Sequence, residues 1–247
     1  MMKTSGNTIL ITGGATGIGF ALAEAFSKHD NEVIICGRRE DRLKEAKEKL
    51  PRVHIQQCDV SKEKERESLF RWVTSNFKDV NMLVNNAGIQ RTIDMKKGIS
   101  CLAGEDEIEV NLKAYVHLAA YFIPYFQNKK EAAIINISSG LGFVPIAAFP
   151  VYCATKAAIH SFSISLRHQL RDTSIQVFEV IPPTVDTELN KEGRGGRHIG
   201  IPPSEVANEV MKALEENEYE IAVGMAKDLR TGAKNNFEEI FKRINQW

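Results

Sequence analysis

The chain of 247 residues lacks several features that mark other protein classes. No apolar run approaches the roughly 20 residues of a membrane-spanning helix. The N-terminus has no charged stretch followed by an apolar signal core and a cleavage site. Lys+Arg and Asp+Glu balance at 32 each, so the basic excess of a dedicated nucleic-acid-binding protein is missing. We therefore expect a cytoplasmic protein that binds neither membrane nor nucleic acid.

Cysteine is scarce and scattered. The four cysteines, at positions 36, 58, 101 and 153, form neither a metal-binding spacing nor a redox pair. Two of them fall in strand-like apolar runs, which favours reduced thiols in the core and suits the cytoplasm. The sequence therefore predicts no metal site and no disulfide framework.

Short apolar runs alternate instead with helix-like segments, and apolar residues make up 43% of the chain. The runs are nearly continuous in Val, Ile and Leu, as expected of strands buried on both faces of a parallel sheet. This alternation predicts one α/β domain over residues 1–247, a doubly wound parallel sheet with helices on both faces. The expected strands span 8–12, 32–36, 53–58, 82–86, 133–138, 175–181 and 219–223. The expected helices span 17–29, 40–49, 62–76, 104–127, 151–171, 204–216 and 234–246.

The first expected strand runs into a glycine-rich turn, TGGATGIG, at residues 12–19. Such a turn lets the backbone approach a ligand closely, and the exposed N–H groups of the helix that follows attract a pyrophosphate. A glycine-rich turn alone is a weak signal, but its position between a first strand and a first helix is the context that a dinucleotide site requires. The residues that we expect to bind cofactor here are Gly13, Ala15, Thr16, Gly17, Ile18 and Gly19.

The second expected strand ends with Gly37, Arg38 and Arg39. The residue at the tip of this strand faces the adenosine ribose in dinucleotide-binding folds. An acidic residue there would bind the 2′-hydroxyl of NAD, whereas two guanidinium groups suit the 2′-phosphate of NADP. The alternative is that both arginines are surface charges paired with Glu40 and Asp41. We predict NADP(H) rather than NAD(H).

Five motifs occur in order: TGGATGIG (12–19), NNAG (85–88), NISS (136–139), YCATK (152–156) and PPTVDT (182–187). Together they resemble the short-chain dehydrogenase/reductase family over nearly the whole chain. The segments 150–173 and 218–229 are similar to oxidoreductases found beside D-alanyl–teichoic acid genes in Gram-positive bacteria. The resemblance implies a seven-stranded Rossmann sheet of order 3-2-1-4-5-6-7 and reversible hydride transfer between NADPH and a carbonyl or alcohol. The alternative function is a catalytically silent module that senses NADP.

On the matching positions, the resemblance makes Tyr152 the acid/base, Lys156 its partner and Ser139 the group that orients the carbonyl. Ser138 is the adjacent alternative to Ser139. Asn111 resembles the residue that kinks the long fourth helix and ties the lysine to solvent through water. Further cofactor contacts implied by the resemblance are Asp59 at the adenine amino group with Val60 next to it in the chain, Asn85, Ala87 and Gly88 on the adenosine side, and Val185 and Thr187 at the nicotinamide amide. Tyr152 and Lys156 are also expected to contact the cofactor, since Lys156 could hold the nicotinamide ribose hydroxyls.

The spacing of Tyr152 and Lys156 fits this chemistry, because residues four apart share one face of a helix. A free tyrosine has a pKa near 10 and is a poor base at neutral pH. A nearby ammonium group stabilises the phenolate, so we expect Lys156 to lower the pKa of Tyr152.

Two segments depart from the simple pattern. Pro183 stands where the family usually has glycine, which leaves the contacts of Val185 and Thr187 less secure because proline removes an N–H. Residues 188–203 carry glycines, arginines and a histidine before two prolines, and we interpret them as a flap over the substrate, with a solvated loop as the alternative.

Helices 104–127 and 151–171 carry much apolar surface; the resemblance places it at the interface of a homodimer or homotetramer, whereas packing on the sheet is the alternative.

Overall fold

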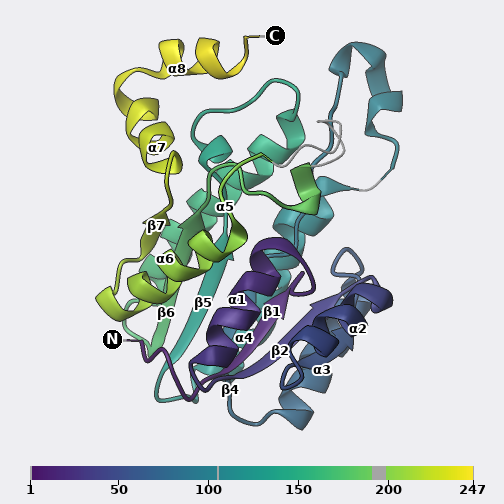
Figure 1. Ribbon diagram of the computed structural model, residues 1–247, viewed down its shortest axis with the longest axis vertical. Helices are drawn as coiled ribbons and strands as arrows, with labels where there is room; N and C mark the ends of the chain where they lie inside the picture. The colour runs from purple at the N-terminus through teal and green to yellow at the C-terminus, as the bar shows by residue number, and fades with distance from the viewer. Residues whose placement is uncertain (1, 105, 191–198, 247) are drawn as a thin grey trace.

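The structure, a computed structural model, describes residues 2–104, 106–190 and 199–246 (Figure 1). Its centre is a seven-stranded, fully parallel sheet in the order β3-β2-β1-β4-β5-β6-β7. The predicted doubly wound fold and its strand order are confirmed. The strands are β1 Thr8–Thr12, β2 Glu32–Gly37, β3 His54–Gln57, β4 Val80–Asn85, β5 Ala132–Ile137, β6 Ile175–Ile181 and β7 Glu220–Ala222.

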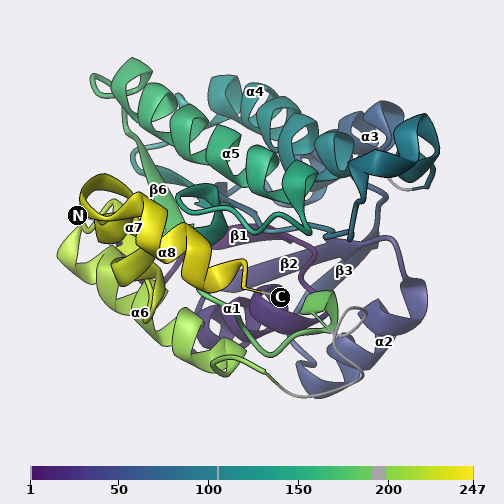
Figure 2. The ribbon, with the colours of Figure 1, turned by 90° about the horizontal axis from the view of Figure 1, so that it is seen from above.

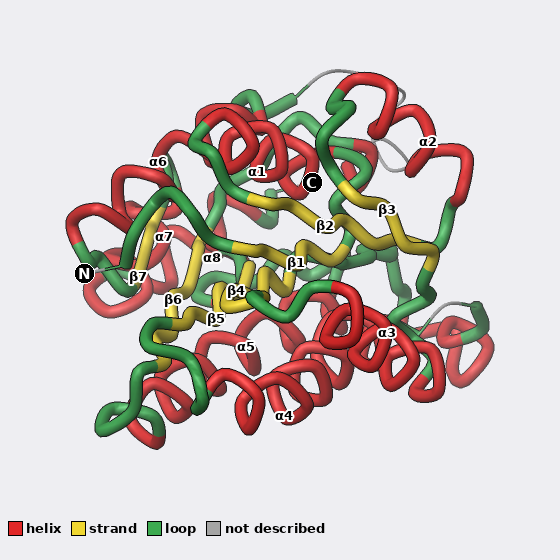
Figure 3. Tube along the Cα trace, turned by 90° about the horizontal axis from the view of Figure 1, so that it is seen from below, coloured by secondary structure: helices red, strands yellow, loops and turns green. Residues whose placement is uncertain are grey.

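Helices cover both faces of the sheet (Figures 2 and 3). Apolar side chains of α1, α2 and α6 pack with one face of the strands, and those of α3, α4 and α5 pack with the other. Every residue of β1 and β5 is buried, which is why their sequences show no polar alternation. The helices are α1 Gly17–Lys28, α2 Glu40–Lys49, α3 Glu63–Asn76, α4 Ala114–Phe126, α5 Pro150–Gln169, α6 Pro203–Glu216, α7 Ala226–Asn235 and α8 Phe237–Ile244.

The expected helix 104–127 is wrong in its start, and the kink that the resemblance implied at Asn111 is a π turn. Asp106 accepts hydrogen bonds from the backbone N–H groups of Ile108 (2.8 Å) and Glu109 (3.3 Å), so the helical backbone begins only after this aspartate. The first turns then widen into a π-helix, η2 Glu109–Lys113, before α4 continues as a regular helix. Such π turns often occur at functional sites.

The expected last helix, 234–246, is in fact two helices, since Asn236 leaves helical backbone geometry between α7 and α8. Both helices, yellow in Figure 1, lie together at one end of the molecule. Asn245 ties this end to the loop before α5: its side chain accepts a hydrogen bond from Ala147 N at 2.6 Å and donates one to Pro145 O at 3.0 Å. In the described part of the chain, no helix is long and apolar enough to cross a membrane.

The predicted flap, 188–203, falls partly outside the described residues, since 191–198 are not among them. Its first residues form a short 3-10 helix, η4 Glu188–Asn190. On the other side, Ile201 bridges to Val185, and Ile201 N donates to Thr184 O at 3.1 Å.

Candidate active site

A cavity of about 520 Å³ opens where the strands of the sheet end. It is lined by the β1–α1 turn, by residues that follow β2 to β6, and by side chains of α5, α7 and α8. Ligands of open α/β sheets bind at the carboxyl ends of the strands, so this cavity is in the expected place.

The glycine-rich turn forms one wall of the cavity, and its glycines leave no room for a Cβ atom. Gly13 has a φ of +63°, and a Cβ there would lie 2.9 Å from Ala87 Cα. Gly17 has a φ of +56°, and its Cβ would lie 2.9 Å from Thr187 Cγ2. Gly19 is needed for a different reason, because its Cβ would meet the Gly13 carbonyl oxygen at 2.3 Å. Gly19 therefore packs the turn and does not line the cavity.

Most residues predicted to bind cofactor line this one cavity: Gly13, Ala15, Thr16, Gly17, Ile18, Arg38, Arg39, Asp59, Val60, Ala87, Gly88, Tyr152, Lys156, Val185 and Thr187. Asn85 does not. It is fully buried in β4, and its Nδ2 donates to Asn136 Oδ1 at 2.9 Å. The next residue, Asn86, lines the cavity and donates to the carbonyl oxygens of Thr12 and Gly13. Alternation of side chains along a strand is the signal that separates these two asparagines.

Three arginines gather at one end of the cavity, on the loop after β2 and the first turn of α2. Arg39 Nη2 lies 2.8 Å from Glu188 Oε2, and Arg42 Nη2 lies 3.2 Å from Glu188 Oε1. Glu45 and Glu188 raise the pKa of Arg42. Arg38 also lines this end. Sequence reasoning missed Arg42, although its place one helical turn after Arg38 and Arg39 could have signalled it.

Asp59 lies beside these arginines. Burial raises the pKa of its carboxyl, but hydrogen bonds from Ser61 and the charges of Lys62 and Arg38 outweigh burial and lower it overall. Ser61 donates to Asp59 Oδ1 from its backbone N at 3.0 Å and from its hydroxyl at 2.7 Å. The carboxylate is thus held ionised at this end of the cavity.

The other end of the cavity is buried. Tyr152 and Lys156 are 7% and 3% exposed on the inner side of α5. Lys156 Nζ donates to Ile137 O at 2.8 Å and lies 5.6 Å from the centre of the Tyr152 ring. Burial lowers the pKa of Lys156 to about 7. The lysine can therefore change protonation state near neutral pH.

The pKa of Tyr152 is raised, not lowered as expected. Burial is the largest cause, and the nearby Cys153 and Glu107 act in the same direction. A side-chain hydrogen bond with Ser139 opposes them. Desolvation outweighs the hydrogen bond with Ser139, and Lys156 is not among the groups that shift the pKa of Tyr152, so the phenol keeps its proton.

The two adjacent serines have different partners. Ser138 Oγ contacts Glu179 Oε1 at 2.5 Å and Val180 O at 3.2 Å, so its proton is directed away from the cavity. Ser139 Oγ accepts from Leu141 N at 3.1 Å and keeps its own proton for Tyr152 or a ligand. The geometry favours Ser139 over Ser138 as the residue that works with Tyr152.

Asn111 occupies the π turn, where the kink was expected. Its side chain accepts from Ile89 N and donates to Ile89 O, both at 2.8 Å, and its Nδ2 lies 3.3 Å from Thr155 Oγ1. It is fully buried and does not line the cavity. Asn111 thus connects the loop after β4 with α5, whereas a water-mediated link to Lys156 stays a prediction.

Comparison with known proteins agrees with this geometry. Residues 7–197 match the short chain dehydrogenase family. The chain is 48% identical over 248 residues to DltE of Bacillus subtilis (strain 168), named an uncharacterized oxidoreductase, covering 99% of this chain and 98% of DltE. It is 32% identical over 178 residues to the NADP-dependent 3-hydroxy acid dehydrogenase YdfG of Escherichia coli (strain K12), covering 72% of each chain.

A solved structure shares the whole architecture. The short chain dehydrogenase from Burkholderia cenocepacia J2315 in complex with NADP superposes with a TM-score of 0.84 at 27% identity, over 98% of this chain and 99% of that one. With the matched motifs, the strand order and the glycine-lined cavity, these likenesses place the chain among the oxidoreductases of the short-chain dehydrogenase/reductase family.

Proposed function

We propose that the protein transfers hydride reversibly between NADPH and a carbonyl or alcohol group of a small molecule, with Tyr152 as the acid/base. One observation carries this proposal. A single cavity bears Ser139, Tyr152 and Lys156 at its buried end and Arg38 and Arg39 at its charged end. Separate ends for reaction and for phosphate recognition are what a dinucleotide-dependent oxidoreductase needs.

The residues of the cavity fit such a cofactor. The positive φ angles of Gly13 and Gly17 and the close contacts that their Cβ atoms would make leave a bare backbone cradle. The N-terminus of α1 opens into it without an acidic side chain in its first turn, which suits a diphosphate. When bound, NADPH supplies the hydride, and Arg38 and Arg39 would hold its 2′-phosphate.

Side chains of the protein would donate a proton to the substrate and replace it after turnover. A phenol with a raised pKa holds its proton at neutral pH, so Tyr152 can donate it as negative charge develops on the substrate oxygen. Ser139 would hydrogen-bond the same oxygen. Lys156, with a pKa of about 7, would return a proton to Tyr152 after turnover. The protonated phenol is the form of Tyr152 that reduction of a carbonyl requires.

Two relatives support the NADP preference. The Burkholderia cenocepacia structure contains NADP, and YdfG is named as NADP-dependent. The side chains beyond Tyr152 are mostly apolar, which supports a substrate with an apolar portion. The residues at this end of the cavity are Leu141, Ile146, Phe149, Met225, Leu229 and Ile244.

The experiment that tests this function follows cofactor absorbance at equal concentrations of NADPH or NADH. The substrate panel contains aliphatic and aromatic ketones and aldehydes, with 3-hydroxy acids for the reverse direction. Turnover with NADPH supports the proposal, and a preference for NADH would overturn the cofactor assignment. Binding of NADPH without turnover across the panel would favour the silent sensing module.

We propose further that the enzyme works in the cytoplasm as a homodimer. The free thiols Cys36, Cys58 and Cys153 are buried, which suits a reducing compartment.

Two exposed isoleucines support the dimer. Ile108, beside α4, and Ile164, on α5, expose 52% and 44% of their surface, which supports pairing through these helices. A solution mass of only the monomer at micromolar concentration would contradict the dimer. Residues 188–203 stay our candidate for the substrate flap.

A further inference from the structure

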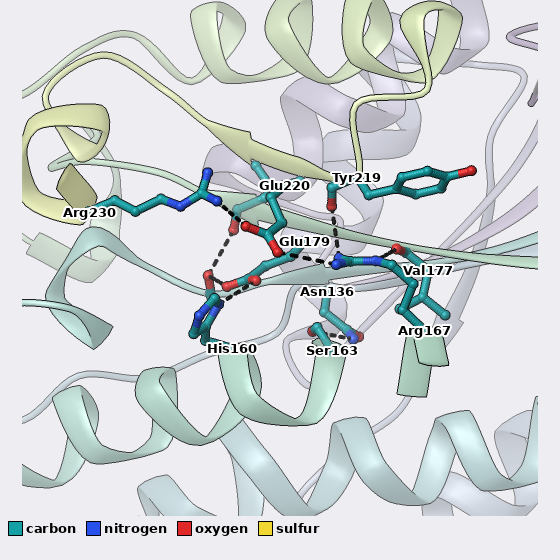
Figure 4. A network of polar contacts seen from close by, with 11 residues as sticks. Asn136, His160, Ser163, Arg167, Val177, Glu179, Tyr219, Glu220 and Arg230 are labelled. Carbon is teal, nitrogen blue, oxygen red and sulfur yellow. Dashed lines mark hydrogen bonds and ion pairs between the residues drawn. The ribbon is translucent and has the colours of Figure 1, made fainter. Parts of the chain in front are cut away.

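A row of polar side chains crosses four strands of the sheet just below the cavity. Four positions lie opposite one another in neighbouring strands: Asn85 in β4, Asn136 in β5, Glu179 in β6 and Glu220 in β7. Figure 4 shows the part of this row from Asn136 to Glu220, with its partners on α5 and α7. A charged group in the middle of a sheet is unfavourable unless it is paired, so each acid in this row needs an explanation.

Glu179 is the most deeply buried acid of the row, with no exposed surface. Its two oxygens have different partners. Oε2 lies 2.7 Å from His160 Nδ1, and Oε1 lies 2.5 Å from Ser138 Oγ. A carboxylate can only accept hydrogen bonds, so both contacts orient protons toward Glu179. His160 reaches solvent, with a quarter of its side chain exposed, and its ring packs 4.5 Å from that of Phe143.

The serine held by Glu179 begins the turn that carries Ser139. The backbone of this turn is attached to β6 and its extension, since Ser138 N donates to Val180 O at 2.8 Å and Gly140 N donates to Pro182 O at 3.0 Å. The contact between Ser138 Oγ and Glu179 is the side-chain anchor of the same turn. It fixes where the following residue, Ser139, presents its hydroxyl to Tyr152.

We propose that Glu179 and His160 are positioning residues: through Ser138 they hold the turn that places Ser139 for the reaction. This inference rests on the proposed function, because it assigns Ser139 a role in that reaction. It gives a reason for keeping an acid in the middle of the sheet, since buried charged groups often add no stability over apolar residues of similar size. His160 lies four residues after Lys156, so the same helix that carries the reacting side chains also carries the partner of Glu179.

Glu220 offers a matched control, because it is the neighbouring acid in the row but touches no serine. It pairs with Arg230 of α7 and, at 3.2 Å, with Arg167 Nη1 of α5. Removing its charge should disturb the packing of β7, α5 and α7, and because α7 packs beside Gly140 the turn at Ser138 should change, but less than on loss of Glu179, which bonds Ser138 directly. A role confined to stability predicts similar effects at Glu179 and Glu220, whereas a positioning role predicts a difference in kcat.

The test compares Glu179→Gln, His160→Ala, His160→Gln and Glu220→Gln with the full-length wild type. The measurements are kcat, the KM of the carbonyl substrate, the Kd of NADPH from fluorescence, and amide hydrogen exchange in residues 136–142. We expect Glu179→Gln and His160→Ala to lower kcat about ten-fold, because small misplacements of reacting groups are costly. Amides of the turn should exchange faster, and the Kd of NADPH should stay unchanged. His160→Gln, which keeps a donor, should retain more activity than His160→Ala.

Wild-type kcat and exchange in both Glu179→Gln and His160→Ala would overturn the proposal. An equal loss of kcat in Glu220→Gln would do the same, since it would show a general effect on packing. If Glu179→Gln does not fold, the two substitutions at His160, which is one-quarter exposed, still decide the question. If the wild type turns over no carbonyl compound, the proposed function fails, but amide exchange still shows whether Glu179 holds the turn.

Discussion

The two ends of the cavity differ in how far their charged and polar side chains are exposed to solvent. At the charged end, side chains face solvent: Arg39, Arg42 and Glu188 form ion pairs with side chains that are more than one-third exposed. At the buried end, Tyr152 and Lys156 are almost fully buried. Water and salt screen the first set and not the second.

This difference separates two tasks. Exposed charges select a ligand by its charge, and each contact there is worth little and can be rearranged. Buried groups work through desolvation, which shifts the pKa values of Tyr152 and Lys156 in opposite directions. Substitutions at the buried end should therefore change the reaction, and those at the exposed end should change the choice of cofactor.

The largest effect on the reaction is expected from Tyr152→Phe at the buried end. Loss of the hydroxyl removes the proton donor, so kcat/KM for the carbonyl substrate should fall about 10³-fold, within the range of general acid–base catalysis. The Kd of NADPH, measured by fluorescence, should not change. Turnover close to that of the wild type would remove Tyr152 from the mechanism.

Lys156→Met tests burial at the same end through stability. Folding lowers the pKa of Lys156 from its ordinary 10.5 to about 7, so between these values the unfolded chain binds more protons and wild-type stability rises with pH. The variant cannot titrate, so its stability relative to wild type should be greatest at pH 6 and should decline toward pH 10. The change in this difference should be on the order of 4 kcal/mol, from urea unfolding at both pH values. A difference that does not depend on pH would show that the lysine is not desolvated.

At the exposed end, Arg38→Ala and Arg39→Ala should each raise the Kd of NADPH about ten-fold, because each removes a charge-assisted contact to phosphate. The Kd of NADH should stay the same. Lys44→Ala is the control, since Lys44 lies on α2 just after these arginines, pairs with Glu40 and does not line the cavity. Equal losses for both cofactors would argue against recognition of a 2′-phosphate.

The smallest expected effect concerns Glu188, which occupies Arg39 and Arg42 and would compete with a phosphate. Glu188→Gln should tighten binding of 2′,5′-ADP about three-fold, as expected for an exposed ion pair, and leave 5′-AMP unchanged. Glu45→Gln is the matched control. Glu45 pairs with the same Arg42 at 2.8 Å but lies outside the cavity. Equal tightening in both variants would show a general charge effect instead of competition.

The sequence predicted most strands because they are nearly continuous apolar runs between helical patterns, and the resemblance of its five motifs to the family implied their order. It also predicted the cavity residues of the glycine-rich turn, of the second strand's tip and of α5. It could not distinguish Asn85 from Asn86, since that choice depends on where β4 ends. The two serines were separated only when Glu179, 41 residues further along, was placed beside Ser138.

Other features depend on tertiary structure in the same way. The kink at Asn111 was implied by the resemblance alone, because no local pattern marks the π turn and its amide is held by Ile89 and Thr155 of distant segments. The direction of the Tyr152 pKa shift was predicted wrongly because the spacing to Lys156 says nothing about how much water is excluded from both. Helix spacing identifies which groups meet, and packing decides their protonation.

The polar row that crosses the sheet also has a consequence for folding. Successive residues of a strand point to opposite faces, so a slip of β6 by one residue would move Glu179 to the face packed by α1 and α6. The strand side chains on that face, such as Ile135, Val180 and Ile221, are apolar, and the acid would lose both its histidine and its serine there. Strands of Val, Ile and Leu are otherwise nearly interchangeable in register. In the observed register, the acids of β6 and β7 both have partners. A slip of β6 by one residue would leave Glu179 without its partners, so these acids disfavour that slip.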